Sequence, residues 1–269
     1  MATIKQEPDA APCGGIELHT AHTLNGIKVA ILLEELKEGY GKEYTVFVMN
    51  GSERETMKHW WIRIAPGGKV PCVIDRDQGR YAITEGHAIL NYLTRHYDPA
   101  LQYSFADPLE ACAAEQWISW LHAGLGPAQA EAASFYRFAP DRQLGPTYYF
   151  YYKLKRYYNE LNNHLAQRGY LAGLEGGRYS IADIAVWPFV DAIGVAGMEL
   201  ESYPNVHRWW RSVRERPAVG RGMRVPGGRP FVYSYEVGQR WAVDDPGGMR
   251  NAERPFRDAL EAARQRFGD

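Results

Sequence analysis

A proline at the start of an apolar run is the feature that most constrains how this chain can fold. The run begins at Val70-Pro71, and because proline cannot donate a hydrogen bond to a sheet ladder, it belongs at the first residue or the edge of a strand. A cis Val70–Pro71 bond would turn the backbone of Val70 outward and leave its N–H and C=O free to pair with an extended ligand. The sequence therefore predicts a sheet edge that can bind a peptide-like molecule.

A helix is expected to begin shortly after this edge. The sequence Thr84-Glu85-Gly86-His87 opens a segment with apolar residues at helical spacing, which predicts a helix over 86–97. The N-terminus of a helix holds anions through its free N–H groups and its dipole. Glu85, beside that site, could bind an ammonium group. An anion site, a cation site and a strand-like edge therefore lie close together in the sequence.

The first part of the chain alternates between strand and helix patterns. Strands are expected over 16–20, 44–49, 70–75 and 81–84, and helices over 28–36, 56–64 and 86–97. The order begins with strand, helix, strand and ends with a hairpin and a helix. It is compatible with a small α/β domain that starts with a βαβ unit.

The strand pattern ends after a polar segment over 98–108, which we interpret as a linker. Helices are expected over 109–124, from Pro146 onward, over 184–195 and over 206–216. The glycines and proline of 124–127 should break or kink the first of these helices. Ser180 and Asp183 have the spacing of a capping box before an apolar helix, for which a structural role is expected.

The predicted fold class is therefore α/β plus all-α, with an α/β domain over 16–98 and an all-helical domain over 108–220. Residues 1–15 are interpreted as a disordered lead-in, and residues 221–269 as a C-terminal extension. Within that extension, the charged segment 250–267 has one apolar face and is expected to form a weakly docked terminal helix.

Composition and charge argue against several classes of function. The 31 basic and 32 acidic residues give a formal net charge of −1, so nothing favours general binding to nucleic acids or anionic membranes. No apolar run approaches the length of a membrane span, and the first fifteen residues lack the apolar core of a signal peptide. The eight tryptophans and eighteen tyrosines suit a pocket for flat, apolar molecules.

The cysteines favour a reducing compartment. Cys13, Cys72 and Cys112 form an odd, sparse set without a C-x-x-C motif, which argues against a disulfide framework or a zinc site. A cytoplasmic location is therefore expected. Cys72, inside an apolar strand pattern, is interpreted as a small buried hydrophobic residue.

Three motifs, in their order and spacing, resemble the glutathione S-transferase family over residues 16–220. They are Thr23-Leu24-Asn25-Gly26-Ile27-Lys28, then Lys69-Val70-Pro71 with Thr84-Glu85, and then Ser180-Ile-Ala-Asp183 with Trp187-Pro188. The resemblance implies a thioredoxin-like N-terminal domain followed by an all-helical C-terminal domain. It is greatest to the branch of bacterial and fungal Ure2-like enzymes, and fungal transferases of specialised metabolism are also similar.

The resemblance implies that the bound molecule is glutathione, lying along the Val70–Pro71 edge. The cysteinyl backbone of glutathione would pair with Val70, and its γ-glutamyl amine would meet Glu85. The γ-glutamyl carboxylate would meet the N–H groups of Gly86 and His87. Lys69 could bind the glycyl carboxylate.

The thiol of glutathione would then point toward the loop before the first helix. Thr23 and Asn25 could donate hydrogen bonds to a thiolate and lower its pKa. The helix that opens near Gly26 adds a favourable dipole. This loop also contains His22, and histidine is the residue type that changes charge near neutral pH. His22 could act as a base or simply face solvent. Thr23 and Asn25 are also common turn residues.

Two positions depart from the family pattern. The family usually has Glu-Ser where this chain has Glu85-Gly86, so a hydroxyl group is lost and weaker glutathione binding is expected, which His87 could offset. Leu24 stands where proline is usual. These departures keep open a binding or regulatory protein that has lost the chemistry.

The leading hypothesis is an enzyme that activates the glutathione thiolate for attack on an electrophilic, apolar small molecule. Conjugation is the simplest form, and reversible addition that isomerises a conjugated alkene is a variant. Glutathione-dependent disulfide reduction is an alternative, for which two glutathiones would supply the thiols because Thr23 is not a cysteine. The resemblance also implies a homodimer with the cleft near the subunit interface.

Overall fold

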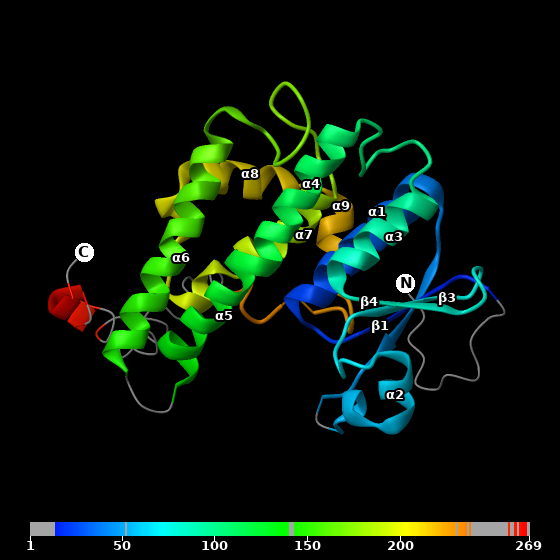
Figure 1. Ribbon diagram of the computed structural model, residues 1–269, viewed down its shortest axis with the longest axis horizontal. Helices are drawn as coiled ribbons and strands as arrows, with labels where there is room; N and C mark the ends of the chain where they lie inside the picture. The colour runs from blue at the N-terminus through cyan, green and yellow to red at the C-terminus, as the bar shows by residue number, and fades with distance from the viewer. Residues whose placement is uncertain are drawn as a thin grey trace.

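The computed structural model describes residues 14–51, 53–139, 143–229, 231–235, 237, 258, 261–262 and 264–267. Most of the expected lead-in over 1–15 and most of the expected terminal helix over 250–267 lie outside the described residues. A four-stranded sheet with its helices occupies one end of the molecule, and a group of helices occupies the other (Figure 1). Within the described residues, no helix has both the length and the apolar character needed to cross a membrane.

The sheet end follows the predicted order of elements. Its elements are β1 (Ile16–Thr20), α1 (Leu24–Tyr40), β2 (Tyr44–Val48), the short turn η2 (Glu55–Met57), α2 (His59–Ile64), β3 (Cys72–Asp75), β4 (Tyr81–Thr84) and α3 (Gly86–Tyr97). The strand order is β2-β1-β3-β4, with β1 and β2 parallel and the other pairs antiparallel. Helix α1 provides the crossover that parallel strands need, which makes the first part of the chain a βαβ unit as predicted.

Alternation along β3 explains why helices cover both faces of the sheet. Val73 belongs to the large core cluster that includes α1 and α3, whereas Cys72 and Ile74 pack with Trp61 of α2 in a second cluster. Successive side chains of a strand point to opposite faces, so both faces of β3 are buried. Helices α1 and α3 accordingly lie on one side of the sheet and α2 on the other (Figure 1).

Helix α1 begins earlier than predicted from its regularly spaced apolar residues, because its N-cap residue lies before the first of them. The hydroxyl of Thr23 accepts a hydrogen bond from the Gly26 amide at 3.1 Å, which satisfies one of the free donors of the first turn. Gly26 also allows α1 to pass close to the end of β1, since a Cβ there would lie 2.3 Å from Thr20 Oγ1 and 2.7 Å from the Ala21 carbonyl oxygen. The predicted helix over 28–36 is therefore extended at both ends, and Asn25 lies in its first turn.

The other end of the molecule is helical in the described residues. Its longer helices are α4 (Pro108–Trp120), α5 (Gly126–Ala133), α6 (Leu144–His164), α7 (Ile181–Asp191), α8 (Pro204–Arg214) and α9 (Pro217–Gly222). The shorter turns are η3 (Leu121–Leu125), η4 (Ser134–Phe138), η5 (Leu165–Gln167), η6 (Ile193–Ala196) and η7 (Leu200–Ser202). The break expected at 124–127 is the wide π turn η3, after which Pro127 occupies the first turn of α5.

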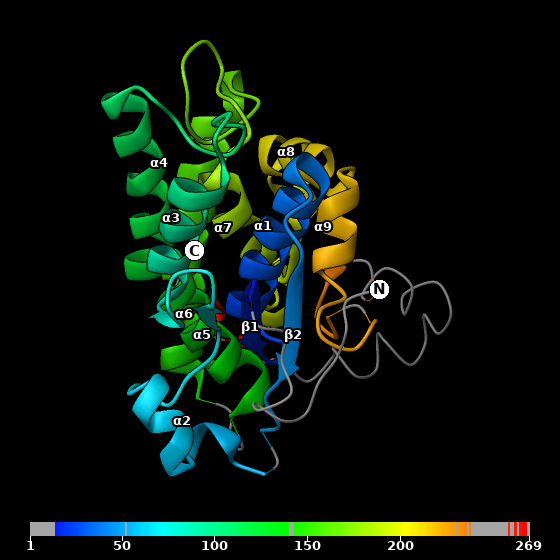
Figure 2. The same cartoon turned by 90° about the vertical axis from the view of Figure 1, so that its right-hand side faces the viewer.

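Helix α1 joins the two ends of the molecule. It packs against both α7 and α9, as Figure 2 shows. Arg216 donates two hydrogen bonds to the carboxylate of Glu35, at 2.6 and 2.8 Å, and Arg221 donates to Glu34 at 2.6 Å. Two-point contacts between arginine and carboxylate fix direction as well as distance. These contacts hold the helical end over the sheet end and set the shape of the space between them.

The capping box at Ser180 and Asp183 is confirmed, and it explains why α7 begins three residues before the predicted helix. Asp183 is fully buried. Its carboxylate accepts hydrogen bonds from the amides of Ser180 and Leu171, each at 3.0 Å, and from the indole of Trp209 at 2.8 Å. The same side chain therefore caps α7 and connects it to α8.

The substitution Asp183→Ala is expected to lower the free energy of unfolding by roughly 3 kcal/mol or more, since it strands several buried donors at 1–3 kcal/mol each. Removing only the cap hydroxyl, in Ser180→Ala, should cost about 1 kcal/mol. Urea unfolding of both variants measures the difference. Equal losses would contradict the role assigned to the Asp183 carboxylate in linking the helices.

Candidate active site

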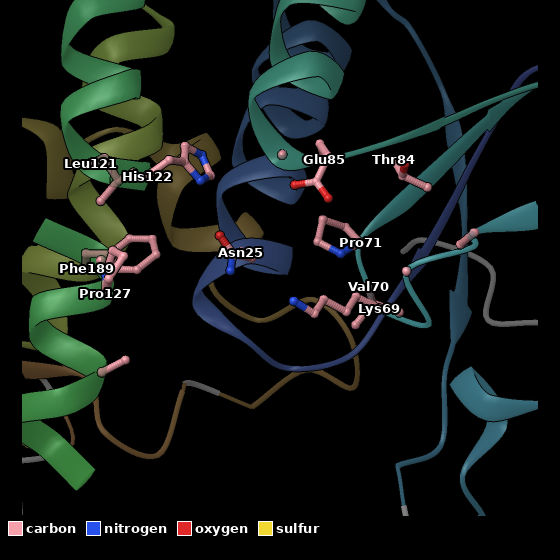
Figure 3. A pocket seen from close by; sticks show the side chains of 15 residues that line it. Asn25, Lys69, Val70, Pro71, Thr84, Glu85, Leu121, His122, Pro127 and Phe189 are labelled. Atoms are coloured by element: carbon pink, nitrogen blue, oxygen red, sulfur yellow. The ribbon is translucent and has the colours of Figure 1, made fainter. Parts of the chain in front are cut away.

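A cleft of about 500 Å³ lies between the sheet end and the helical end. One wall comes from the residues around Val70 and Glu85, and the other from His122, Pro127 and Phe189 (Figure 3). Asn25, from the first turn of α1, lies between the two walls. The cleft is within the range of sizes that hold small molecules and cofactors.

The sheet-side wall includes the residues just before β3, but β3 lies between β1 and β4, so the prediction that Pro71 begins a strand at the sheet edge was wrong. The Val70–Pro71 bond is cis, as expected. The β3–β4 ladder begins at the pair Cys72–Thr84, so the N–H and C=O of Val70 lie beyond the paired register. Lys69 is exposed, and its side chain extends into the cleft (Figure 3). This wall therefore offers a strand-like backbone and one cation.

The start of α3 presents donors and a carboxylate to the same space. Glu85 has a φ of +66°, a conformation that costs energy for a residue with a Cβ and that is typical of functional sites. Its carboxylate points toward the cleft (Figure 3). No side chain among the described residues caps the helix after Glu85. The first amides of α3 are therefore available to an anion.

The loop before α1 sends its predicted residues in different directions. Asn25 is exposed and lines the cleft, whereas the Thr23 hydroxyl is engaged as the cap of α1. The Nε2 of His22 lies 3.1 Å from the Met223 carbonyl oxygen, and its ring meets the edge of Phe231. His22 therefore contacts the C-terminal segment, which sequence reasoning did not foresee.

The structure brings most of the predicted site residues to one cleft. Those that line it are Asn25, Lys69, Val70, Pro71, Glu85 and Gly86. Thr23, His22 and His87 are not among the described residues that line it. The ring of His87 stacks parallel to that of His122, with centroids 6.4 Å apart, and burial lowers the pKa of His87.

The principal residue that sequence reasoning missed is Lys28, which is fully buried behind the cleft. Its Nζ donates to Asn25 Oδ1 at 2.7 Å and lies 3.0 Å from Nε2 of His122. Burial lowers the pKa of Lys28 to about 7, and the nearby charge of Glu85 opposes this shift. The signal that could have revealed it is a lysine inside the apolar run Ile27–Ile31.

Lys28 also accounts for the glycine at position 86. A Cβ on Gly86 would lie 2.3 Å from Lys28 Cε and 2.6 Å from its Nζ, far inside van der Waals contact. A side chain at position 86 and the observed position of Lys28 are therefore incompatible. The resemblance leads one to expect a serine at position 86. Its side chain is absent here, and the buried side chain of Lys28 occupies that space.

His122 was also missed, and it comes from the wide π turn η3. Burial, followed by the charge of Lys28, lowers the pKa of His122 to about 4, so the ring is neutral near pH 7. When Lys28 is protonated its ammonium group can only donate hydrogen bonds, so in that state the neutral His122 ring accepts through the Nε2 that faces Lys28. In that state the proton of His122 is on Nδ1.

The helical wall beside His122 is apolar. Leu121, Pro127 and Phe189 line it, and in Figure 3 the Phe189 ring faces the gap. The tyrosines of α6, such as Tyr148 and Tyr152, line a different hollow. This wall can receive a flat apolar group.

Within the described residues, no cysteine lines the cleft. Cys72 is buried, as expected, and burial raises its thiol pKa to about 12, while Cys112 is exposed on α4. Cys13 lies outside the described residues. The described residues also contain no group of three or more His, Cys, Asp or Glu side chains that could hold a metal ion. The described residues therefore place no cysteine thiol in this cleft.

Comparison with known families assigns both ends of the molecule. Residues 20–95 match the profile of the glutathione S-transferase N-terminal domain, and residues 152–217 match the profile of its C-terminal domain. A curated relative, the disulfide-bond oxidoreductase YfcG of Escherichia coli (strain K12), is 31% identical over 212 residues, which cover 77% of this chain and 94% of the relative.

Two solved structures show the same fold. A glutathione transferase homologue from Lodderomyces elongisporus, with two glutathiones per subunit, matches with a TM-score of 0.72 and 28% identity over 79% of this chain and 99% of its own. The glutathione transferase URE2P5 from Phanerochaete chrysosporium matches with a TM-score of 0.70 and 26% identity over 78% of this chain and 94% of its own.

Proposed function

Because the chain belongs to the glutathione S-transferase family, we propose that it is a glutathione-dependent enzyme that activates the thiol of glutathione in the cleft. The observation that carries the proposal is the orientation of Asn25. Its Oδ1 accepts from Lys28, so its amide NH₂ is left for a group in the cleft. An NH₂ donor directed at sulfur favours the thiolate and lowers the thiol pKa.

The walls of the cleft offer a partner for each polar end of glutathione. The backbone of Val70 would pair with the cysteinyl residue, as a strand edge pairs with an extended peptide. The γ-glutamyl ammonium would meet Glu85, and its carboxylate would meet the amides of Gly86 and His87 at the start of α3. The exposed Lys69 would bind the glycyl carboxylate. The similar structures from L. elongisporus and Pseudomonas fluorescens, which were crystallised with glutathione, support glutathione as the ligand.

The thiolate would attack an electrophilic, apolar molecule placed against Leu121, Pro127 and Phe189. In conjugation, a sulfur–carbon bond forms and either a leaving group departs or an acceptor carbon is protonated. In the isomerase variant, the same addition to a conjugated alkene is reversed after rotation about the former double bond, and glutathione is released unchanged. The protein supplies position and electrostatics, and glutathione supplies the reacting atom. A substrate from fungal specialised metabolism is part of this proposal.

Disulfide reduction is the second candidate, and a specific observation favours it: the relative YfcG is named a disulfide-bond oxidoreductase. Since no cysteine lines the cleft within the described residues, two glutathiones would be needed. One thiolate attacks the disulfide and releases one half as a thiol. A second glutathione then attacks the mixed disulfide, giving oxidised glutathione and the other thiol. The structure of the L. elongisporus homologue with two glutathiones per subunit is consistent with this stoichiometry.

Two assays with the purified protein and glutathione separate these reactions. A dinitrobenzene halide reports conjugation through an adduct identified by mass, and hydroxyethyl disulfide reports reduction through oxidised glutathione. Turnover of either above the uncatalysed rate supports the proposal and chooses the reaction. Binding of glutathione without either activity would favour the non-catalytic alternative. A homodimer and a cytoplasmic location remain parts of the proposal, to be tested by sedimentation and cell fractionation.

A further inference from the structure

A buried lysine contacts two side chains of the cleft at once. Lys28 has no exposed surface, and its Nζ bonds Asn25 at 2.7 Å and His122 at 3.0 Å. These two residues come from different ends of the molecule, one from α1 and the other from η3. One ammonium group therefore connects the sheet end to the helical wall behind the place proposed for the thiol.

The chemistry of an ammonium group fixes the orientation of both partners. It carries three donors and no acceptor, so Asn25 must present its oxygen and His122 an unprotonated nitrogen. The remaining polar groups, the Asn25 NH₂ and the His122 Nδ1–H, are then both donors. Asn25 and His122 both line the cleft, where these donors can meet a negatively charged atom.

The charges that face Lys28 come from several elements. Glu85, before α3, favours its charged form, while burial opposes it. The pKa values of His122 on η3 and His87 on α3 are both lowered in part by Lys28, and the Phe189 ring of α7 has its centroid 5.8 Å from Nζ. An anion in the cleft would add to the effect of Glu85 and favour the ammonium further. The site is therefore ready to gain a positive charge when a thiolate forms.

We propose that Lys28 is a positioning residue for the thiolate, acting through Asn25 and His122. Its buried ammonium holds both side chains as hydrogen-bond donors toward the sulfur and supplies the counter-charge beneath them. Gly86 leaves the space that the Lys28 side chain occupies, since a Cβ at position 86 would overlap Lys28. This inference rests on the proposed glutathione function and adds the residue that controls ionisation of the thiol.

The test is the ionisation of bound glutathione in Lys28→Met, followed through the ultraviolet absorbance of the thiolate as a function of pH. Methionine keeps an unbranched side chain that is one atom shorter, and removes the charge and the donors. The thiol pKa in the complex is expected to rise by about one unit or more, while the Kd for glutathione, measured by calorimetry at a pH where the thiol is protonated in both complexes, changes by less than about threefold. An unchanged thiol pKa in this complex would overturn the inference.

Two further variants keep the result specific. Gly86→Ala retains the lysine but displaces it, and should raise the thiol pKa in the same direction. Lys69→Met removes an exposed cation that contacts neither Asn25 nor His122 in the described hydrogen bonds, and should weaken glutathione binding without moving the thiol pKa. An equal shift of the thiol pKa in Lys69→Met would show that any nearby positive charge suffices, and would contradict a role for Lys28 through its two partners.

Folding of Lys28→Met is expected to be retained. A lysine whose pKa is lowered by folding costs stability below that lowered value, and the cost falls as the pH rises toward the pKa of the unfolded lysine. Near pH 7, the variant should therefore unfold at a temperature no lower than that of the wild-type protein. Failure of the wild-type protein to bind glutathione would refute the proposed function. Binding with an ionised thiol that is unaffected by Lys28→Met would refute only this inference.

Discussion

Replacing Asn25 with alanine is expected to lower kcat for glutathione-dependent turnover by about 10²–10³-fold, the usual effect of removing a donor to a reacting anion. The Kd for glutathione should change by less than about threefold, because the backbone and the two charged ends of the ligand supply most of the binding. Steady-state kinetics together with calorimetry measure the two quantities on one preparation. The physical reason is that Asn25 Oδ1 is held by Lys28, which leaves its NH₂ for the sulfur.

Two comparison variants distinguish donation of a hydrogen bond to the sulfur from a role of Asn25 in holding the loop in place. Asn25→Asp keeps the contact with Lys28 but places a carboxylate oxygen where the NH₂ donor was, so it should be at least as inactive as Asn25→Ala. Thr23→Ala removes the cap of α1, which should lower stability by about 1 kcal/mol. If Asn25→Ala lost affinity and turnover to the same extent, Asn25 would serve to hold the loop and the assignment would be wrong.

The substitution Glu85→Gln is expected to weaken glutathione binding by about 10- to 100-fold, since hydrogen bonds between charged groups contribute about 1.5–3 kcal/mol. Glutamine keeps the size of the side chain and the unusual backbone of this position, and removes only the charge that would meet the γ-glutamyl ammonium. Calorimetric titration measures the affinity. The charge of Glu85 also favours the ammonium form of Lys28. The loss of affinity in Glu85→Gln should therefore be accompanied by a rise in the thiol pKa that is smaller than the rise in Lys28→Met.

The control for Glu85 is a change in the ligand. A glutathione analogue that lacks the γ-glutamyl amine should bind the wild-type protein about as weakly as glutathione binds Glu85→Gln. The same analogue should lose little more on the variant, because the interaction is already absent. Additive losses would place the amine elsewhere, and an unchanged affinity of Glu85→Gln for glutathione would refute the role proposed for this carboxylate.

Local sequence signals predicted the sheet end of the fold well. Pro71 indicated where β3 begins, although β3 is an interior strand rather than the predicted edge, and the position of α3 follows from the residues after Thr84. Helix boundaries were less accurate where a cap precedes the apolar spacing. Thr23 starts α1 before the first apolar stripe, and the capping box of Ser180 starts α7 at Ile181. Turn and capping chemistry act between near neighbours, so they can be read from one sequence.

The residues that were missed depend on contacts between distant parts of the chain. Lys28 and His122 are far apart in sequence and meet only because the fold brings η3 close to the start of α1. Their importance follows from burial, which one sequence does not reveal for a polar residue. Gly86 shows the same limit. From the sequence, a glycine at this position indicated only that a serine hydroxyl is lost, whereas in the structure the absence of a side chain leaves room for Lys28. The contact of His22 with Met223 likewise depends on the C-terminal segment.

The most direct test of the central claim is a titration of the wild-type protein with glutathione at neutral pH, recorded both as heat and as thiolate absorbance. Saturable binding with a Kd below about 1 mM is expected, together with thiolate absorbance that is greatly reduced in Asn25→Ala. Absence of binding at millimolar glutathione would contradict the account, and so would binding without ionisation of the thiol.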